Sequence, residues 1–397
     1  MRVSTSGAFR DGVRAMQTLA VAVGETQRRI SSGRRNLRPS DDPIAAARAV
    51  GFREGISRLG QFQRNGNAAR GRLEHEESGL ISVTNVLQRA RELVLRAGNA
   101  TESAETRKIF AIELREQLES LVQTANQRDG NGRFLFAGNQ DGSQPVSRNA
   151  SGFLYNGDQG ERVIQIGATR LVSDGDSGAA VFFDIRNGNG TFRTNAAVAN
   201  TGTGVLGFSS VEDPSLYDKG QYTVRFVDPD NYEVLDSAAV VIAAGTYQSG
   251  DSIAFRGISF TIDGAPATGD EFLVEPSRYQ SMFQTLQNIV DVLESTTDNA
   301  ADRVTIRNAM NAGLQEIDQS LLNVSAVRTK IGIRLNAIDS QLDNNSAASI
   351  LAQQAVSELE DVDYAQALST LSLQAAVLEA SQQSFALTQR LSLFQFL

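Results

Sequence analysis

The last third of the chain almost lacks the two residues that interrupt helices. Residues 277–397 contain no proline and only two glycines, Gly313 and Gly332. Because proline and glycine are the least favourable residues inside a helix, this segment can form long helices and is difficult to reconcile with a β-domain. Apolar residues in it recur at alternating steps of four and three, the heptad spacing of a coiled coil. They are Met310, Leu314, Ile317, Leu321, Val324, Ile331, Leu335, Ile338 and Leu342, and only Arg328 interrupts them.

The N-terminal third contains apolar faces of the same kind. Residues 44–144 lack proline, and the spacing recurs at Leu80, Val83, Leu87, Ala90, Val94 and Ala97. A further apolar face is predicted at Ile112, Leu114, Leu118, Leu121, Val122 and Ala125. Since each face needs a partner helix, we expect the two ends of the chain to form one helical bundle.

The middle of the chain has a different period. Five of the seven prolines lie between residues 145 and 276, and apolar residues there alternate with a period of two. The alternating sets are Tyr222, Val224 and Phe226, then Ile253 and Phe255, then Ile258, Phe260 and Ile262, the last two sets separated by a break that contains glycine. This pattern predicts antiparallel strands.

The predicted fold class is therefore α+β: a long-helix bundle formed by the N- and C-terminal regions, with an inserted antiparallel β-rich domain. We expect terminal helices at 1–43 and 346–397 and a bundle domain at 44–144 and 277–345. The β-rich outer domain is expected at 145–276.

Composition excludes most catalytic chemistry. The chain has no cysteine and one histidine, His75, so disulfides, thiolate sites and histidine-dependent triads are excluded. A net charge of -9 argues against nucleic acid or an anionic membrane as the main partner, and no apolar run approaches the ~18 residues of a membrane span. We expect no enzymatic activity, no cofactor, no metal, no membrane insertion and no cleaved secretory signal.

Four patterns that resemble chemical motifs have simpler interpretations. Residues 75–79 begin like a zincin helix, but Gly79 stands where the second histidine is needed. Residues 202–207 match GxGxxG without the flanking strand and helix of a dinucleotide site, so a glycine-rich turn is expected. Residues 174–178 resemble a calcium loop but lack its later ligands, so a solvated loop is expected. The β-domain carboxylates are expected to serve local hydrogen bonding; they are Asp228, Asp230, Asp263, Asp270 and Glu271.

The strongest local signal lies at residues 30–43, which end one helix and begin another. Gly33 suits a helix C-terminus, with Arg34 and Arg35 beside the negative end of the helix dipole. Asp42 suits an N-cap, and Pro43 suits the first position of the next helix. Two jointed helices are predicted.

With these residues the chain resembles the flagellin superfamily. The resemblance lies in seven segments: Leu37 to Pro43, Asn131 to Gly138, Gly202 to Val205, Gly264 to Val274, Val327 to Gly332, Glu358 to Tyr364 and Leu391 to Leu397. Within the superfamily they are more similar to the hook-filament junction (third hook-associated, FlgL-type) proteins than to filament flagellin. Residues 1–45 lack the Ala-Asn motif of the first hook-associated protein and of the hook and rod proteins.

The resemblance implies a secreted structural subunit of the bacterial flagellum that joins hook to filament and serves motility. It implies unfolded export by the flagellar type III apparatus and polymerisation through the terminal helices into a ring. The implied partners are further copies of the chain, a neighbouring hook-associated protein, flagellin, and an export chaperone on the C-terminal region. Filament flagellin is the alternative, and a β-domain that binds a surface glycan or receptor is a less favoured one.

Charge suggests how the ends would meet. Residues 1–40 carry a net charge of +6, and residues 341–397 carry -5. We expect these segments to pair, within a subunit or between neighbours. The candidate assembly residues are Arg28, Arg29, Arg34, Arg35, Asp41, Asp42, Arg328, Glu358, Glu360, Asp361, Asp363, Phe385, Leu391, Phe394 and Phe396.

Overall fold

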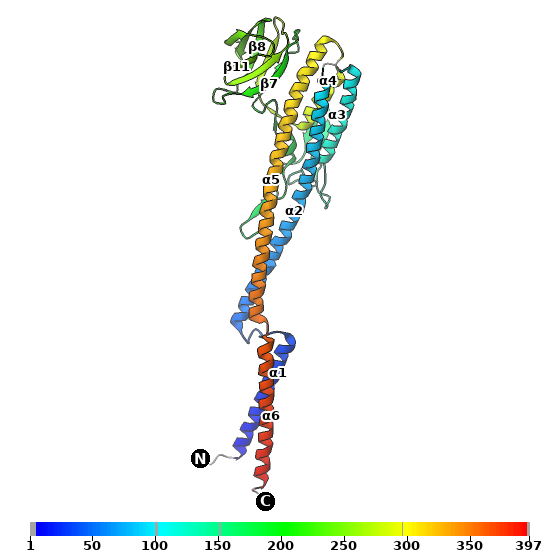
Figure 1. The fold of residues 1–397 in the computed structure, drawn as a ribbon. Coiled ribbons are helices and arrows are strands. Elements are labelled where there is room, and N and C mark those ends of the chain that lie inside the picture. Colours follow the sequence, from blue (N-terminus) through cyan, green and yellow to red (C-terminus); the bar gives the residue numbers. More distant parts are fainter. Residues whose placement is uncertain (1–4, 100–101, 151, 296, 395–397) are drawn as a thin grey trace. The chain divides into compact units, whose positions relative to one another are not determined.

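The computed structural model describes residues 5–99, 102–150, 152–295 and 297–394 (Figure 1). The chain divides into two compact units, and the long helices α2 (Pro43–Ala97) and α5 (Ala300–Glu360) contribute residues to both. One unit contains residues 1–64 and 340–397, and the other contains residues 65–339. The predicted fold class, helical terminal regions around an antiparallel β-rich centre, is confirmed. The predicted domain boundaries stay a prediction.

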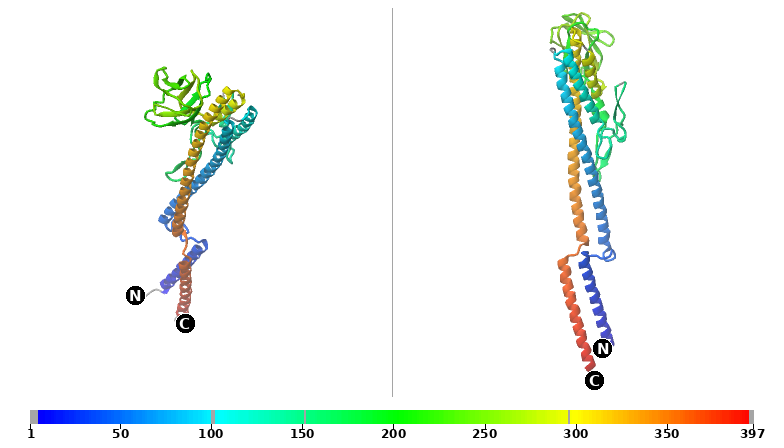
Figure 2. Two further views of the ribbon diagram at one scale, coloured as in Figure 1. Left: turned by 45° about the horizontal axis from the view of Figure 1, so that its top comes forward. Right: turned by 90° about the vertical axis from the view of Figure 1, so that its right-hand side faces the viewer.

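In the first unit, α1 (Thr5–Ser32) and α6 (Tyr364–Phe394) form an antiparallel pair (Figures 1 and 2). The rings of Phe9 and Phe385 lie 5.1 Å apart between centroids. Nearer the other end of the pair, the Thr26 hydroxyl donates to Oε1 of Gln374 at 2.9 Å. α1 and α6 therefore contact each other at both ends of the pair.

The second unit contains a helical bundle built from parts of α2 and α5 with α3 (Ala104–Ala125) and α4 (Met282–Ser295). The predicted face of α2 is buried throughout: Leu80, Val83, Leu87, Ala90, Val94 and Ala97. On α5 one heptad row is buried, namely Met310, Ile317, Val324, Ile331 and Ile338. The alternate row is half-buried at Leu314, Leu321, Arg328 and Leu335 and buried at Leu342, so one side of the seam is better covered than the other over most of its length.

One member of the predicted α3 face was wrong. Leu114, Leu118, Leu121 and Ala125 are buried, but Ile112 is exposed. Ile112 lies two residues from Leu114, a step that places it on another side of the helix.

The β-rich region contains two main antiparallel sheets. The five-stranded sheet has the order β10-β9-β8-β13-β6, and the three-stranded sheet has the order β11-β12-β7. Their strands are β6 (Phe192–Ala196), β7 (Val205–Val211), β8 (Tyr222–Asp228), β9 (Asn231–Asp236), β10 (Val241–Thr246), β11 (Ser252–Phe255), β12 (Ile258–Asp263) and β13 (Glu271–Pro276). One aromatic-rich core joins the two sheets and includes Phe226 of β8, Phe260 of β12 and Phe272 of β13. The predicted alternation at residues 222–226 is observed in β8, where buried residues alternate with half-buried ones.

The predicted break between β11 and β12 is a tight hairpin turn. Arg256 and Gly257 both have positive φ, at 48° and 74°, as a type I′ turn requires. A Cβ on Gly257 would lie 2.2 Å from the carbonyl oxygen of Asp213, so only glycine fits there.

Among the residues that the structure describes, three two-stranded pairs lie outside these sheets. They are β1 (Val146–Asn149) with β2 (Gly152–Tyr155), β3 (Val163–Gln165) with β4 (Leu171–Ser173), and β5 (Ile185–Arg186) with β14 (Tyr279–Gln280). A short π-helix, η1 (Ala179–Phe183), places Phe182 in a cluster with Phe136 and Phe283.

Candidate assembly surface

In the first unit, the segment between α1 and α2 is hydrogen-bonded to the segment between α5 and α6. We call these two segments together the joint. α1 ends at Ser32, and Gly33 follows with φ of 68°, as the sequence predicts for a helix C-terminus. The N–H of Arg35 donates to the carbonyl of Glu360 at 2.7 Å, and the N–H of Val362 donates to the carbonyl of Gly33 at 2.9 Å. Two backbone hydrogen bonds thus join the α1–α2 break to the α5–α6 break.

Carboxylates fix both sides of this joint. Asp42 Oδ1 accepts from the N–H of Ala45 at 2.9 Å, which confirms the predicted N-cap of α2. Asp41 Oδ2 accepts from the N–H groups of Leu37 and Arg38, both at 3.0 Å. Asp363 Oδ1 caps α6 by accepting from the N–H groups of the second and third residues after it. The sequence carries a signal for this second cap, an aspartate followed three residues later by glutamine, which our sequence analysis missed.

Removing the cap of α2 should weaken the joint measurably. We expect Asp42→Ala to lower the free energy of unfolding by about 0.5–2 kcal/mol, because the N–H of Ala45 loses its acceptor. Asp42→Ser retains an acceptor oxygen and should cost much less. Thermal unfolding followed by circular dichroism compares the two; equal loss in both variants would assign the effect to the carboxylate charge and not to the cap.

The predicted charge pairing is not a set of direct ion pairs within the described chain. No ion pair within 4 Å links Arg28, Arg29, Arg34 or Arg35 to Glu358, Glu360, Asp361 or Asp363. Arg35 lies 3.7 Å from Asp42, Glu360 pairs with Arg53 of α2, and Asp361 accepts from the Ser357 hydroxyl. A pocket of about 570 Å³ nevertheless has both signs on its walls, from Arg29, Arg35, Glu358, Asp361 and Asp363.

α6 has apolar residues on two sides. Ala367, Leu371, Leu378 and Phe385 are half-buried on the side of α1. Leu373, Val377 and Leu387 point elsewhere and are 67%, 42% and 60% exposed. We call the set Leu373, Val377 and Leu387 the outer face of α6. This face was missed from the sequence, although Leu373, Val377 and Leu387 lie outside the heptad-spaced row that faces α1.

The remaining predicted residues have separate surroundings. Arg328 of α5 forms an ion pair with Glu77 of α2, with Nη2 at 2.7 Å from Oε1, inside the bundle. This contact explains an arginine in the heptad seam. Phe396 lies outside the described residues, as do the side chains of Leu391 and Phe394.

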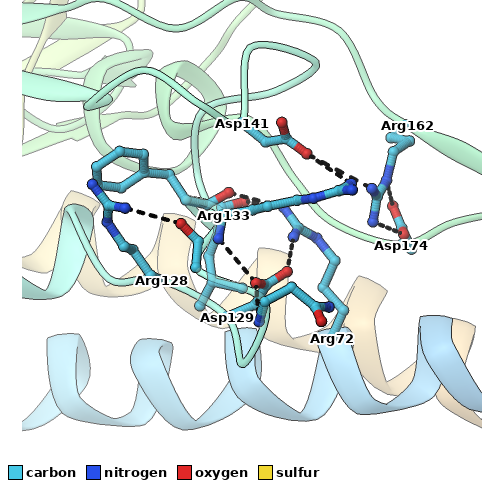
Figure 3. A network of polar contacts seen from close by, with 11 residues as sticks. Arg72, Arg128, Asp129, Arg133, Asp141, Arg162 and Asp174 are labelled. Carbon is cyan, nitrogen blue, oxygen red and sulfur yellow. Dashed lines mark hydrogen bonds and ion pairs between the residues drawn. The ribbon is translucent and has the colours of Figure 1, made fainter.

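A separate polar network lies in the second unit (Figure 3). Arg72 of α2 binds Asp129 at 2.8 Å and donates to the carbonyls of Phe134 and Leu135. Arg133 lies 3.3 Å from Asp141, Asp141 lies 3.8 Å from Arg162, and Nε of Arg162 donates to Asp174 at 3.0 Å. This network gives residues 131–138 a structural role. The backbone carbonyls of Phe134 and Leu135 accept from Arg72 and so hold this loop on α2.

The loop at 174–178, predicted to be solvated, is buried. Asp174 is 2% and Asp176 is 5% exposed. Asp174 accepts from Nε of Arg162 at 3.0 Å, and Asp176 lies 2.7 Å from Nη1 of Arg334 on α5. The prediction was wrong because these guanidinium groups, one of them 158 residues away, neutralise carboxylates that would otherwise need water.

Glu76 lies beside this loop. It accepts from the N–H of Asp176 at 3.1 Å. Burial, and then the negative charge of Asp176, raise the pKa of Glu76 well above its ordinary 4.5. The folded state therefore favours the protonated carboxyl.

This raised pKa makes a pH-dependent prediction. A carboxyl with a raised folded-state pKa contributes its full stability below pH 4.5 and loses it as pH rises through the folded-state value. Glu76→Gln keeps the acceptor and cannot ionise, so the variant should be more stable than the parent at neutral and alkaline pH and equal to it near pH 4. Denaturant unfolding at several pH values measures the difference; a constant difference across pH would contradict a buried neutral Glu76.

The other candidate motifs are structural. Of the predicted glycine-rich turn, residues 202–204 form a loop with a bend at Gly202, and residues 205–207 belong to β7. The carboxylate of Asp270 accepts from the N–H groups of Thr201, Gly202 and Ala267 at 2.8–3.0 Å. Only the bond from Ala267 is local in sequence, as predicted; the other two reach residues 69 and 68 positions away. Among the described residues, no cluster of three or more histidine, aspartate or glutamate side chains could hold a metal ion. None of the described helices is long and apolar enough to cross a bilayer.

Comparisons with known proteins agree with this organisation. Residues 10–141 match the bacterial flagellin N-terminal helical region, and residues 314–397 match the bacterial flagellin C-terminal helical region. The flagellar hook-associated protein 3 of Escherichia coli K12 is 26% identical over 396 residues, covering 100% of this chain and 99% of that protein. The crystal structure of Xanthomonas campestris FlgL is 31% identical with a TM-score of 0.73, covering 77% of this chain and 99% of that one. A flagellin of Salmonella montevideo is 27% identical over 335 residues, which cover 75% of this chain and 64% of that protein.

Proposed function

The chain belongs to the flagellar hook-associated protein 3 family, the FlgL type within the flagellin superfamily, and on this premise we propose that it polymerises through α1 and the outer face of α6. Its role is structural, at the hook-filament junction of the extracellular flagellum. The family is not known to be enzymatic. Proteins of this family assemble into the flagellum with other flagellar proteins.

The outer face of α6 is the observation that carries the polymerisation proposal. α1 covers one side of α6 and leaves Leu373, Val377 and Leu387 exposed. Burying a leucine side chain contributes about 1.5–3 kcal/mol, so neighbouring copies that cover these residues would gain substantially. The charged groups at the joint would add register and association rate more than affinity.

The proposal extends to export and to partners. The chain would leave the cell unfolded through the flagellar type III apparatus, and the absence of cysteine means that no disulfide could obstruct it. An export chaperone would cover the apolar sides of α6 before assembly. In the flagellum, the neighbours would be further copies in a ring, another hook-associated protein and flagellin.

A deletion strain tests the junction role and separates it from that of filament flagellin. Without this protein, hooks should form without filaments, and flagellin should appear in the medium. Electron microscopy of the cells and analysis of the medium measure both. Filaments of normal length in the deletion strain would contradict the proposal.

We expect the isolated chain to be monomeric at micromolar concentration, with its terminal helices the first part to be digested. Few contacts from within one chain cover these helices, so they should open before the bundle. Limited proteolysis should trim the ends and leave a core of residues 45–345. First cleavage within residues 310–342 would contradict a stable bundle.

A further inference from the structure

Arg72 has one hydrogen-bond donor that the polar network of the second unit does not use. Its Nη1 lies 2.8 Å from Asp129 (Figure 3), and its Nη2 donates to the carbonyls of Phe134 and Leu135. Its Nε is buried, and no atom of the described residues accepts a hydrogen bond from it. A buried donor without an acceptor is destabilising, and more so when it belongs to a charged group. The guanidinium group therefore needs an acceptor beside Nε.

The space beside Nε lies next to Gly175. A Cβ built on Gly175 would have three polar atoms as its nearest neighbours: Nε of Arg72 at 3.5 Å, Oε2 of Glu76 at 3.6 Å and the carbonyl oxygen of Leu135 at 3.8 Å. Arg72, Leu135 and Gly175 also line a cavity of about 10 Å³. A polar cavity of this volume holds one water molecule.

The walls of this cavity select a neutral ligand that both donates and accepts hydrogen bonds. Nε of Arg72 needs an acceptor and would repel a cation. The guanidinium groups on the walls already have carboxylate partners, and Asp176 adds a further carboxylate, so an anion is disfavoured. The carbonyl of Leu135 can only accept, whereas Oε2 of Glu76 accepts when the carboxyl is ionised and can donate when it is protonated. Water satisfies all of these groups.

We propose that this cavity binds one water molecule, which accepts a hydrogen bond from Nε of Arg72 and links it to Oε2 of Glu76. Arg72 and Glu76 are four residues apart, so they lie on one face of α2. The water would join this face to the loop at 174–178, which the ion pair between Asp176 and Arg334 holds on α5. Gly175 is needed there because a side chain would occupy the place of the water.

The test fills this place in the full chain. Gly175 has no positive φ, and a Cβ on it would meet no atom closer than 3.5 Å, so alanine fits without strain. A glycine-to-alanine change of this kind usually stabilises a protein by reducing the entropy of the unfolded chain. Because the methyl group would displace the water and leave Nε without an acceptor, G175A should instead raise the unfolding equilibrium constant at least about fivefold. Denaturant unfolding measures this constant.

Gly142 provides a matched control. It is exposed, it has no positive φ, and a Cβ on it would have no atom within 4 Å. G142A should therefore leave the unfolding equilibrium constant unchanged or lower it slightly. If G175A is as stable as G142A, the proposal is wrong.

Two further measurements assign the effect to Nε of Arg72. A high-resolution crystal structure of the parent protein should show a water about 2.7–3.2 Å from Nε, and that of G175A should lack it. In a chain that already carries R72M, G175A should change the unfolding equilibrium constant by less than about twofold, because the donor is gone. A parent crystal structure without this water overturns the proposal, as does an effect of G175A that is equal with and without R72M. If R72M does not fold, the two crystal structures decide.

Discussion

Replacing Arg72 by methionine should lower the free energy of unfolding of the second unit by about 3–5 kcal/mol, as expected when one partner of a buried ion pair is removed. Both Arg72 and Asp129 are largely buried, with their charged atoms 2.8 Å apart. Methionine preserves the apolar stem and leaves the carboxylate and the carbonyls of Phe134 and Leu135 without this donor. Denaturant unfolding measures the loss.

Arg70 offers a matched control two residues away on α2. It forms ion pairs with Glu74 at 3.9 Å and Asp339 at 3.5 Å, and all three side chains are exposed. Arg70→Met should therefore change stability by only about 0–1 kcal/mol. Equal effects of the two substitutions would show that burial does not distinguish the pairs, and would contradict a structural role for the network.

Lowering the pH should weaken the ion pair between Arg72 and Asp129. Burial alone would raise the pKa of Asp129, but hydrogen bonds from the N–H groups of Arg133 and Asn131, and then the guanidinium of Arg72, outweigh it and leave the pKa below 3.8. A lowered pKa contributes stability that is present above pH 3.8 and lost as pH falls through the folded-state value. When denaturant unfolding is repeated at several pH values, the difference in free energy of unfolding between the parent and Arg72→Met should become smaller at acid pH.

The helices and strands could be predicted because periodicity records which side of an element is covered. Ile317 and Val324 are buried at heptad spacing, and Val224 and Phe226 are buried at every second residue. The periodicity of apolar residues does not predict how completely neighbouring elements cover a face. The half-buried second row of α5 and the exposed Ile112 depend on neighbours that the local pattern does not contain.

The polar network could not be predicted because its members are far apart in sequence. Asp174 and Asp176 have the local pattern of a solvated turn, and only folding brings Arg162 and Arg334 to them. The net charge of each segment was an incomplete guide at the joint. It predicted attraction between the chain ends, but three of the four acids there already have partners within the chain: Glu360, Asp361 and Asp363. Reversing these acids would damage the joint itself, so a test of assembly needs residues without such contacts.

The outer face of α6 provides such residues. We expect L373D/V377D to fold normally, because both side chains are exposed in the single chain, and to lose incorporation onto purified hooks by at least about a hundredfold. In the polymer each substitution would replace a buried apolar group with a carboxylate that lacks a partner. The control S372D/Q382D adds the same charge to the same helix at exposed polar positions on other sides, and should incorporate at nearly the parental rate. Circular dichroism verifies folding, and cosedimentation with hooks measures incorporation. If both variants incorporate equally well, the outer face is not the contact; if both fail equally, added charge on α6 and not loss of its apolar face is what blocks assembly.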